Sequence, residues 1–223
     1  MVKGVDRVTI EIRPYTRNDY EGLLSVQREA FPPPFPEELW WKREQIEDHV
    51  SLYPEGAMVA LCDGIVVGSA TSLLITYTGQ PHTWAEVSDN GYIRRSHDPE
   101  GDSLYGIDLC VRPSYRSRGV AGALYEARKQ LVVRSGLKRF MAGCRIPGFH
   151  LHAGSMSAEE YVGRVVDGEF KDLVLSFMLR QGMVPIQVLD DYLEDEESLN
   201  KAVLVEWRNE RCITTISGGE TAS

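Results

Sequence analysis

The sequence predicts an α/β protein built around a mixed, mostly antiparallel sheet that is flanked by helices. Two observations lead to this prediction. Short runs that alternate apolar and polar residues are interspersed with longer amphipathic segments along residues 8–208. In addition, Asp63-Gly64 joins two apolar runs and is a favoured two-residue turn of an antiparallel hairpin. Strands and helices that alternate in this way pack as helices on a sheet.

In the first third of the chain, the residue pattern predicts a strand, two helices and a hairpin. Thr16 and Asp19 have the spacing of a helix N-cap, and the prolines of residues 32–36 form a stiff break after that helix. A second helical pattern follows and stops at Pro54-Glu55-Gly56. The expected elements are a strand at 8–13, helices at 16–31 and 37–53, and hairpin strands at 57–62 and 65–77.

In the rest of the chain, the residue pattern predicts a long loop followed by further strands and helices. Residues 78–102 are polar and punctuated by glycine and proline, so we expect a surface loop or lid. Gly136 is a predicted helix C-cap, and Ser157 with Glu160 has a capping-box spacing. The expected strands lie at 105–111, 139–144, 183–189 and 202–207, and the expected helices at 120–135, 157–167 and 173–180. We expect one domain over residues 1–210, with a loop insertion at 78–104 and a tail at 211–223.

The composition is that of a soluble globular protein. Hydrophobic residues make up 43% of the chain and charged residues 26%, with a net charge of −9. This acidity argues against a nucleic-acid partner and leaves room for a cationic substrate. The four cysteines are scattered, without a zinc or disulfide pattern. No segment has the pattern of a signal peptide or a membrane span, so the sequence predicts a cytoplasmic protein with no membrane partner and no metal.

The most informative segment is the apolar run Tyr105–Val111 and the basic turn that follows it. Residues 116–122 read Arg-Ser-Arg-Gly-Val-Ala-Gly and lead into an amphipathic helix. The first turn of a helix has unpaired N–H groups and a positive dipole end, so basic residues there are unfavourable unless an anion is bound. Small residues let a phosphate approach those N–H groups closely. The pattern predicts a diphosphate-bearing ligand; the alternative is an ordinary helix start with a solvated basic first turn.

Residues 116–121 resemble the Arg/Gln-x-x-Gly-x-Gly/Ala signature of the GNAT acetyltransferase superfamily, and the order of elements over residues 8–208 is that of the GNAT fold. The resemblance implies that the turn holds the pyrophosphate of acetyl-CoA. It also implies that the strand end before the turn polarises the thioester carbonyl and pairs with the pantetheine arm. The implied cofactor-binding residues are Leu109, Cys110, Val111, Arg116, Ser117, Arg118, Gly119, Val120, Ala121 and Gly122.

A closer resemblance is to the GNAT domain that precedes a nitrilase-type carbon–nitrogen hydrolase domain in some bacterial proteins. It implies transfer of an acetyl group from acetyl-CoA to a primary amine of a small molecule or peptide, by direct attack in a ternary complex. The chain ends at Ser223, so we expect a free-standing version, and a homodimer is one assembly open to it. The segments that carry this resemblance include Tyr105–Asp108, Leu124–Lys129, Gly143–His150, Glu159–Val162, Asp190–Leu193 and Glu206–Asn209.

Amine acylation requires that the ammonium lose a proton and that the departing thiolate gain one. Asp108 is the first candidate for the base, directly or through water, because an acidic residue occurs at this strand position in many family members. The alternatives, given equal weight, are that Asp108 pairs with an arginine or binds the ammonium. Tyr105 is a second candidate, although a strand tyrosine is more often a packing residue with a hydrogen-bonded hydroxyl.

The general acid is where the sequence departs from the family pattern. Many members carry a Tyr and an Asn on the last helix, and those positions are Met178 and Lys171 here. Methionine has no proton to donate, which leaves Tyr161, Tyr125 or water for this role. His150 and His152 lie in the loop after the fifth strand, where histidines are catalytic candidates but more often surface residues. The same departure favours an alternative function, a non-catalytic acyl-CoA-binding module.

Overall fold

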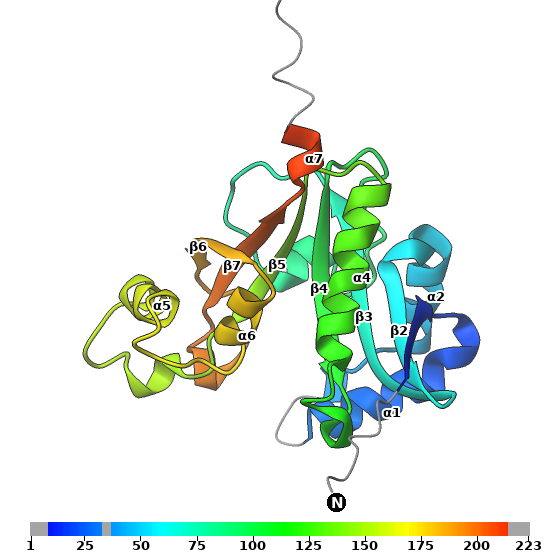
Figure 1. Cartoon of the computed structure of the whole chain (residues 1–223), viewed down its shortest axis with the longest axis horizontal. Coiled ribbons are helices and arrows are strands. Elements are labelled where there is room, and N and C mark those ends of the chain that lie inside the picture. Colours follow the sequence, from blue (N-terminus) through cyan, green and yellow to red (C-terminus); the bar gives the residue numbers. More distant parts are fainter. Residues whose placement is uncertain (1–8, 33–36, 214–223) are drawn as a thin grey trace, which may run out of the picture. The chain divides into compact units, whose positions relative to one another are not determined.

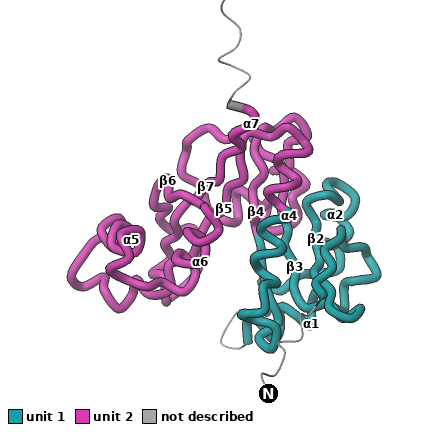
Figure 2. The backbone as a smooth tube through the Cα atoms, in the orientation of Figure 1, with its two compact units in different colours: residues 1–71, 108–127 teal, residues 72–107, 128–223 magenta. Residues whose placement is uncertain are grey.

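The structure is a computed structural model, and it describes residues 9–32 and 37–213. The chain forms two compact units, shown in different colours in Figure 2. Unit 1 spans residues 1–71 and 108–127, and unit 2 spans residues 72–107 and 128–223. The seven strands of the described residues follow the order β1-β2-β3-β4-β5-β7-β6 (Figure 1). The predicted mixed, mostly antiparallel sheet is confirmed, because β4 and β5 pair in parallel while the pairs β1–β2, β2–β3, β5–β7 and β6–β7 are antiparallel. The expectation of a single domain stays a prediction.

Unit 1 contains the predicted hairpin. Strand β2 spans Ala57–Cys62, and β3 spans Ile65–Ile75, two residues shorter than predicted. The turn residues Asp63 and Gly64 have φ values of 50° and 78°, as a two-residue hairpin turn with positive φ at both positions requires. Strand β1, Ile10–Pro14, pairs antiparallel with β2, which is buried along its whole length.

The second helix of unit 1 begins later than predicted. Helix α1 spans Tyr20–Ala30, but residues 37–39 form only a single 3-10 turn and α2 spans Arg43–Leu52. The side chain of Gln27, on α1, accepts the backbone N–H of Trp41 at 2.6 Å, and Gln45 Oε1 accepts the N–H of residue 42 at 2.7 Å. These side-chain acceptors replace helical carbonyls, so the expectation of one continuous helix is wrong.

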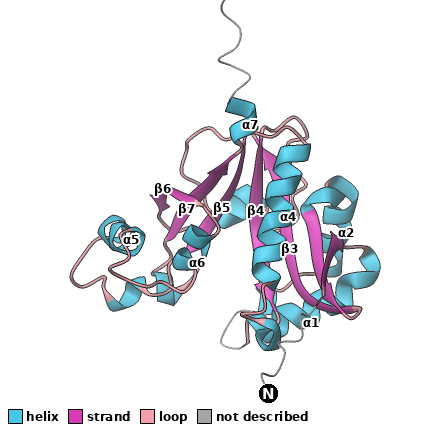
Figure 3. Ribbon diagram, viewed as in Figure 1, coloured by secondary structure: helices cyan, strands magenta, loops and turns pink. Residues whose placement is uncertain are grey.

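Unit 2 contains β5, β6, β7 and the first five residues of β4, whereas residues 108–111 of β4 belong to unit 1. Strand β4 spans Ser103–Val111, β5 Arg139–Arg145, β6 Val184–Leu189 and β7 Ala202–Arg208 (Figure 3). The parallel register of β4 with β5 covers four residue pairs, from Ser103↔Arg139 to Gly106↔Ala142. Side chains from these strands are fully buried and form the core, among them Leu104, Tyr105, Phe140, Met141, Leu204 and Val205.

The insertion in unit 2 is more ordered than a loop. Helix α3, Trp84–Ser88, begins at a capping box in which Thr83 Oγ1 accepts the Glu86 N–H at 3.2 Å and Glu86 Oε2 accepts the Thr83 N–H at 2.7 Å. It ends at Asp89 in the left-handed conformation. The expectation of a loop is therefore wrong for residues 84–88, where Thr83 and Glu86 carry a local helix signal.

Four further helices follow in the described part of the chain. Helix α4, Val120–Arg134, ends as predicted at Gly136, where the N–H groups of Gly136 and Leu137 donate to the carbonyls of Val133 and Val132. Ser157 Oγ accepts the Glu160 N–H and caps α5, which confirms the predicted cap. Helix α5 spans Ala158–Val166, α6 spans Leu175–Arg180, and α7 spans Glu210–Ile213. Residues 33–36 of the predicted proline break and residues 214–223 of the predicted tail lie outside the described residues.

Candidate active site

The turn between β4 and α4 lies in unit 1 and has an unusual backbone. A single 3-10 turn, Pro113–Tyr115, follows the strand, and then Ser117 and Gly119 both take positive φ, at 59° and 87°. The first helical hydrogen bond of α4 runs from the Ala123 N–H to the Gly119 carbonyl at 2.9 Å. A Cβ on Gly119 would meet no atom within 4 Å, so glycine is required there by its φ angle and not by a lack of space.

The open donors of this turn are backbone N–H groups that follow Arg116, whereas Arg116 itself donates its N–H to the Pro113 carbonyl and its side chain to the Ala30 carbonyl. Within the described part of the chain, none of the backbone N–H groups of residues 117–122 donates to a protein acceptor. Residues 116–119 are exposed, and Arg116 and Arg118 form no ion pair among the described residues. Arg118 instead lies 5.3 Å from the centroid of the Tyr115 ring. Free N–H groups at a helix start, together with two guanidinium groups, form a site whose chemistry suits an anion.

The turn is anchored to β3 by residues that sequence reasoning did not select. Arg112 donates its backbone N–H to the Val67 carbonyl at 2.8 Å and its side chain to the Val66 carbonyl. A Cβ on Gly68 would lie 3.0 Å from the Cys110 carbonyl oxygen and 3.1 Å from Val120 Cγ1. Glycine therefore lets β3 approach both the strand end and the helix start. The available signal was a lone glycine within an apolar strand pattern.

Asp108 and Cys110 lie on the part of β4 that belongs to unit 1. The Asp108 side chain is half-buried, and Cys110 is buried, with its Sγ 3.2 Å from Ser69 Oγ. Burial raises the pKa of the Cys110 thiol well above its ordinary value, and the negative charge of Asp108 raises it further. The thiol stays protonated at neutral pH, so Cys110 contributes to a site through its backbone and its packing.

Tyr105, on the unit 2 part of β4, is fully buried and hydrogen-bonded. Its hydroxyl lies 2.9 Å from His82 Nε2 and 3.1 Å from the Tyr192 hydroxyl. Burial raises the pKa of Tyr105 well above its ordinary value, so the phenol remains neutral. The predicted alternative of a packing tyrosine with a bonded hydroxyl describes this environment. His82 and Tyr192 were not selected from the sequence, since they lie 23 and 87 residues from Tyr105.

The insertion is also attached to β4 one residue before Asp108. Trp84 Nε1 donates to the Ile107 carbonyl at 2.8 Å. Ile107 is the residue that follows the last one paired with β5, Gly106. On β5, a Cβ on Gly143 would overlap the Tyr192 ring at 2.2 Å, so the ring lies directly against that backbone. Side chains of Trp84 and Tyr192 thus occupy the place where the β4–β5 ladder ends.

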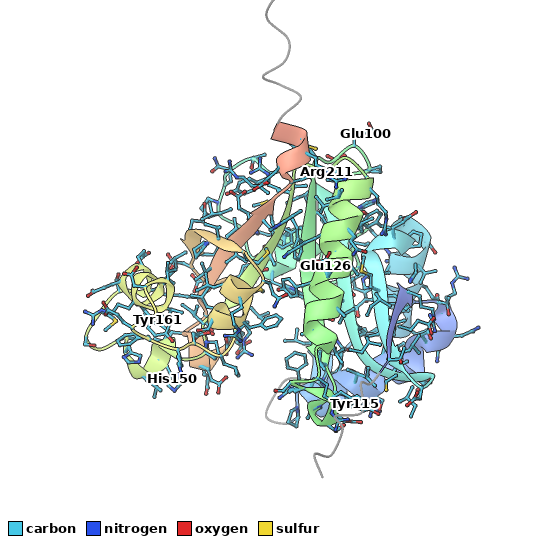
Figure 4. All side chains as sticks on the ribbon, viewed as in Figure 1. Glu100, Tyr115, Glu126, His150, Tyr161 and Arg211 are labelled. Atoms are coloured by element: carbon cyan, nitrogen blue, oxygen red, sulfur yellow. The ribbon has the colours of Figure 1, made fainter. Side chains whose placement is uncertain are left out.

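Tyr161 lies on α5 (Figure 4), and its hydroxyl has a structural partner. Its hydroxyl donates to Asp172 Oδ2 at 2.9 Å, and the side chain is 1% exposed. Asp172 also accepts the N–H groups of Gly148 and Leu175, at 3.0 and 2.9 Å. Burial raises the pKa of Tyr161, and the neighbouring Asp172 raises it further. These contacts join the loop after β5 to the start of α6, and a role for Tyr161 as a proton donor stays a prediction.

The other candidates of unit 2 differ in their surroundings. Met178 is buried on α6, whereas Lys171 is exposed. His150 is exposed and its Nδ1 lies 2.8 Å from the Pro147 carbonyl, while His152 stacks on Phe170 with ring centroids 4.5 Å apart. Within unit 2, the structure therefore brings Tyr105 together with His82, and not with Tyr161 or His150.

A pocket of about 380 Å³ lies in unit 2, at the end of β3 and the start of the insertion. Its lining combines hydroxyl, imidazole and carboxylate groups with a few apolar side chains. It is formed by Ile75, Thr76, Tyr77, Thr78, Gln80, Pro81, His82, Glu86, Val87, Ser96 and Asp98.

The structure thus has a mixed sheet and, between a strand and a long helix, a turn whose open N–H groups and guanidinium groups suit an anion. Sequence comparison gives the family. The acetyltransferase (GNAT) family profile matches residues 20–153, more than half of the chain. The chain is 45% identical to the uncharacterized N-acetyltransferase YkwB of Bacillus subtilis (strain 168) over 202 residues, 90% of this chain and 89% of that protein. The chain belongs to the GNAT acetyltransferase family and is an N-acetyltransferase by homology.

Two other relatives extend this result. The chain is 39% identical over 201 residues to the probable hydrolase YhcX of the same organism, covering 89% of this chain but only 38% of YhcX. This agrees with the resemblance to a GNAT domain joined to a hydrolase domain. A solved structure of the GphF GNAT-like decarboxylase in complex with isobutyryl-CoA superposes with a TM-score of 0.72 at 24% identity, over 89% of this chain and 98% of that one. At this identity the likeness concerns the fold.

Two searches of the described residues bear on other kinds of site. In residues 9–32 and 37–213, each helix is too short or too polar to span a bilayer. In the same residues, no three His, Cys, Asp or Glu side chains gather as a metal-binding group.

Proposed function

We propose that the protein transfers an acetyl group from acetyl-CoA to a primary amine of a small molecule or peptide, by direct attack in a ternary complex. The observation that carries the proposal is the turn of residues 116–122, where the backbone N–H groups of residues 117–122, which have no acceptor among the described residues, adjoin the side chains of Arg116 and Arg118. Such a turn has the donors and the charge that a diphosphate needs. Membership of the GNAT family makes acyl-CoA the natural bearer of that diphosphate.

In this proposal two segments hold acetyl-CoA, the end of β4 and the turn that follows it. Residues 116–122 bind the diphosphate through backbone N–H groups and guanidinium charge. Leu109, Cys110 and Val111 offer their backbone to the pantetheine arm, and one N–H of this strand end polarises the thioester carbonyl. The donor supplies an activated acetyl carbonyl and a good leaving group. The anchoring of the turn by Arg112 and Gly68 keeps these groups in place before the donor binds.

Asp108 directly precedes this strand end along the chain and is the proposed acidic group of the reaction. As a half-buried carboxylate it is suited to orient the acceptor ammonium or to take its proton, directly or through water. A thiolate of CoA is a stable leaving group, so water is sufficient as its proton source even though Met178 occupies the usual tyrosine position. Family membership favours this catalytic role over a non-catalytic acyl-CoA-binding module. The four free thiols agree with a cytoplasmic location.

The test begins with calorimetric titration of the full chain with acetyl-CoA, CoA and ATP in parallel. We expect micromolar binding of acetyl-CoA and CoA and much weaker binding of ATP, because the turn and the strand end together recognise both the diphosphate and the pantetheine arm. Thiol release from acetyl-CoA, followed with a chromogenic disulfide, then measures turnover over a set of amines. Absence of CoA binding would refute the proposal. Binding without turnover of any amine would favour the acyl-CoA-binding module.

A further inference from the structure

The two arginines of the turn between β4 and α4 contact different elements of unit 1. Arg116 donates a side-chain N–H to the carbonyl of Ala30, the last residue of α1, at 3.3 Å. Arg118 lies against the Tyr115 ring, 5.3 Å from its centroid. Tyr115 and Arg118 both lie near the thiol of Cys62, the last residue of β2. One guanidinium group is therefore directed to the end of α1 and the other to the end of β2.

Arg118 has more hydrogen-bond donors open than Arg116. A guanidinium group has five N–H donors, and the Ala30 carbonyl accepts one of those of Arg116. Within the described part of the chain, the side chain of Arg118 makes no hydrogen bond and no ion pair, not even with Asp63, the acidic residue that follows Cys62. The Arg118 side chain is exposed. All five of its donors and its full charge are therefore open to a ligand.

Coenzyme A has two separate phosphate groups that such a turn could bind. Its ribose carries the diphosphate on the 5′ side and a phosphate monoester on the 3′ oxygen. The monoester has about −1.5 to −2 charges at neutral pH and three oxygens that accept hydrogen bonds. An arginine with open donors pairs with such a group through two parallel N–H···O bonds. Of the two phosphate groups, the 3′-phosphate therefore suits Arg118, because the open backbone N–H groups of residues 117–122 already suit the diphosphate.

We propose that Arg118, held against Tyr115, binds the 3′-phosphate of the acetyl donor, while Arg116 and the backbone N–H groups of residues 117–122 bind its diphosphate. The inference rests on the proposed function and goes beyond it, because it names the part of the donor that each arginine recognises. It also defines the class of donor. The phosphopantetheine arm of a carrier protein has no nucleotide, so the protein selects a free acyl-CoA over an acyl group on such an arm.

Tyr115 (Figure 4) is a positioning residue in this inference. A long, exposed arginine side chain loses rotamer entropy when a ligand orders it, and this loss weakens binding. The half-buried Tyr115 ring attracts the guanidinium group of Arg118 and limits its freedom before the donor binds. Arg118 is thus the residue that contacts the donor, and Tyr115 acts through it.

The test compares coenzyme A with 3′-dephospho-coenzyme A, which differs from it only in the 3′-phosphate. In calorimetric titrations of the full chain we expect CoA to bind about tenfold or more tightly than the dephospho form. In Arg118→Gln the Kd of CoA should rise to about that of the dephospho form, whose own Kd should change by less than about twofold. Equal Kd values for the two ligands in the native protein, or an undiminished preference in Arg118→Gln, overturn the inference.

Arg116→Gln is the matched control, because it removes the other guanidinium group of the same turn. We expect this variant to bind both ligands more weakly by the same factor and to keep the preference for CoA. Both arginine side chains are exposed, so urea unfolding should show native stability for the two variants. If Arg116→Gln removes the preference for CoA, the assignment of the 3′-phosphate to Arg118 is overturned.

Two variants of Tyr115 test the positioning role. Tyr115→Phe keeps the ring and should keep the full preference for CoA over the dephospho form. Tyr115→Leu removes the ring and should reduce that preference to about threefold, because Arg118 then loses more entropy on binding. A full preference in Tyr115→Leu overturns the role of Tyr115.

The same titrations separate this inference from the proposed function. Pantetheine 4′-phosphate, which has the arm but no nucleotide, should bind about 100-fold or more weakly than CoA. Binding of this compound as tight as that of CoA overturns the stated class of donor. Equal binding of CoA and its dephospho form overturns the inference and leaves the proposed function standing. Failure of CoA and its dephospho form to bind at all overturns the proposed function itself.

Discussion

Replacement of Gly119 by valine is the most direct test of the proposed donor-binding turn. At φ of 87° an L side chain is strained, and the left-handed conformation costs a non-glycine residue about 1–2 kcal/mol. No neighbouring atom lies within 4 Å of the Cβ position, so the substitution adds strain but no clash with the core. Relief of that strain rotates the peptide groups on either side. The N–H groups of the turn then lose their common direction.

The expected loss of affinity follows from the number of bonds involved. A hydrogen bond to a charged group is worth about 1.5–3 kcal/mol, so loss of two such bonds costs about 3–6 kcal/mol. This weakens CoA binding by about 10²–10⁴-fold. The free energy of unfolding should fall only by the strain of about 1–2 kcal/mol. Calorimetry with CoA measures the first quantity, and urea unfolding followed by circular dichroism measures the second.

Gly168→Val is the matched control for this experiment. Gly168 has a φ of 79°, and its Cβ position is equally open, but it follows α5 and lies outside the turn. We expect the same loss of stability and an unchanged Kd for CoA. If the two variants bind CoA equally well, the assignment of residues 116–122 as the donor site is refuted.

Three further predictions concern single carboxylates and a tyrosine. Asp108→Asn should leave the Kd of acetyl-CoA unchanged and lower kcat at neutral pH by about 10²-fold; native kcat in this variant would exclude Asp108 as the base. Tyr161→Phe should lower the free energy of unfolding by about 1–2 kcal/mol, because buried Asp172 loses a donor, and should leave kcat unchanged; a large loss of kcat would show that Tyr161 is the acid. The Arg13 guanidinium lowers the pKa of Asp19 from 3.8 to about 2. Because the folded-state pKa is depressed, this pair stabilises the protein above the unfolded-state pKa, by about 2 kcal/mol, and the contribution is lost as pH falls from about 5 to 2. Asp19→Asn should remove that part of the acid dependence of urea unfolding, and an identical pH dependence in both proteins would contradict the assignment.

Several local features could be predicted from the sequence because they depend on neighbouring residues. The Asp63-Gly64 turn, the Ser157 cap and the basic turn before α4 all appear where the residue pattern places them. Each depends on backbone angles or on hydrogen bonds that span a few positions, so a short window contains the needed information. The Thr83–Glu86 capping box had the same local signal, and the surrounding glycine and proline residues obscured it.

Other features were decided only by the tertiary structure. Helix α2 begins at Arg43 because the side chain of Gln27, on α1, accepts a hydrogen bond from the backbone N–H of Trp41. The environment of Tyr105 depends on His82 and Tyr192, which the fold brings together from distant parts of the chain. A hydrogen bond needs its donor and acceptor atoms within about 3 Å of each other. Which side chain reaches a given backbone N–H or buried hydroxyl therefore depends on how distant segments pack. The sequence alone therefore determined the family, the sheet and the basic turn before α4, whereas long-range packing decided where α2 begins and which groups surround Tyr105.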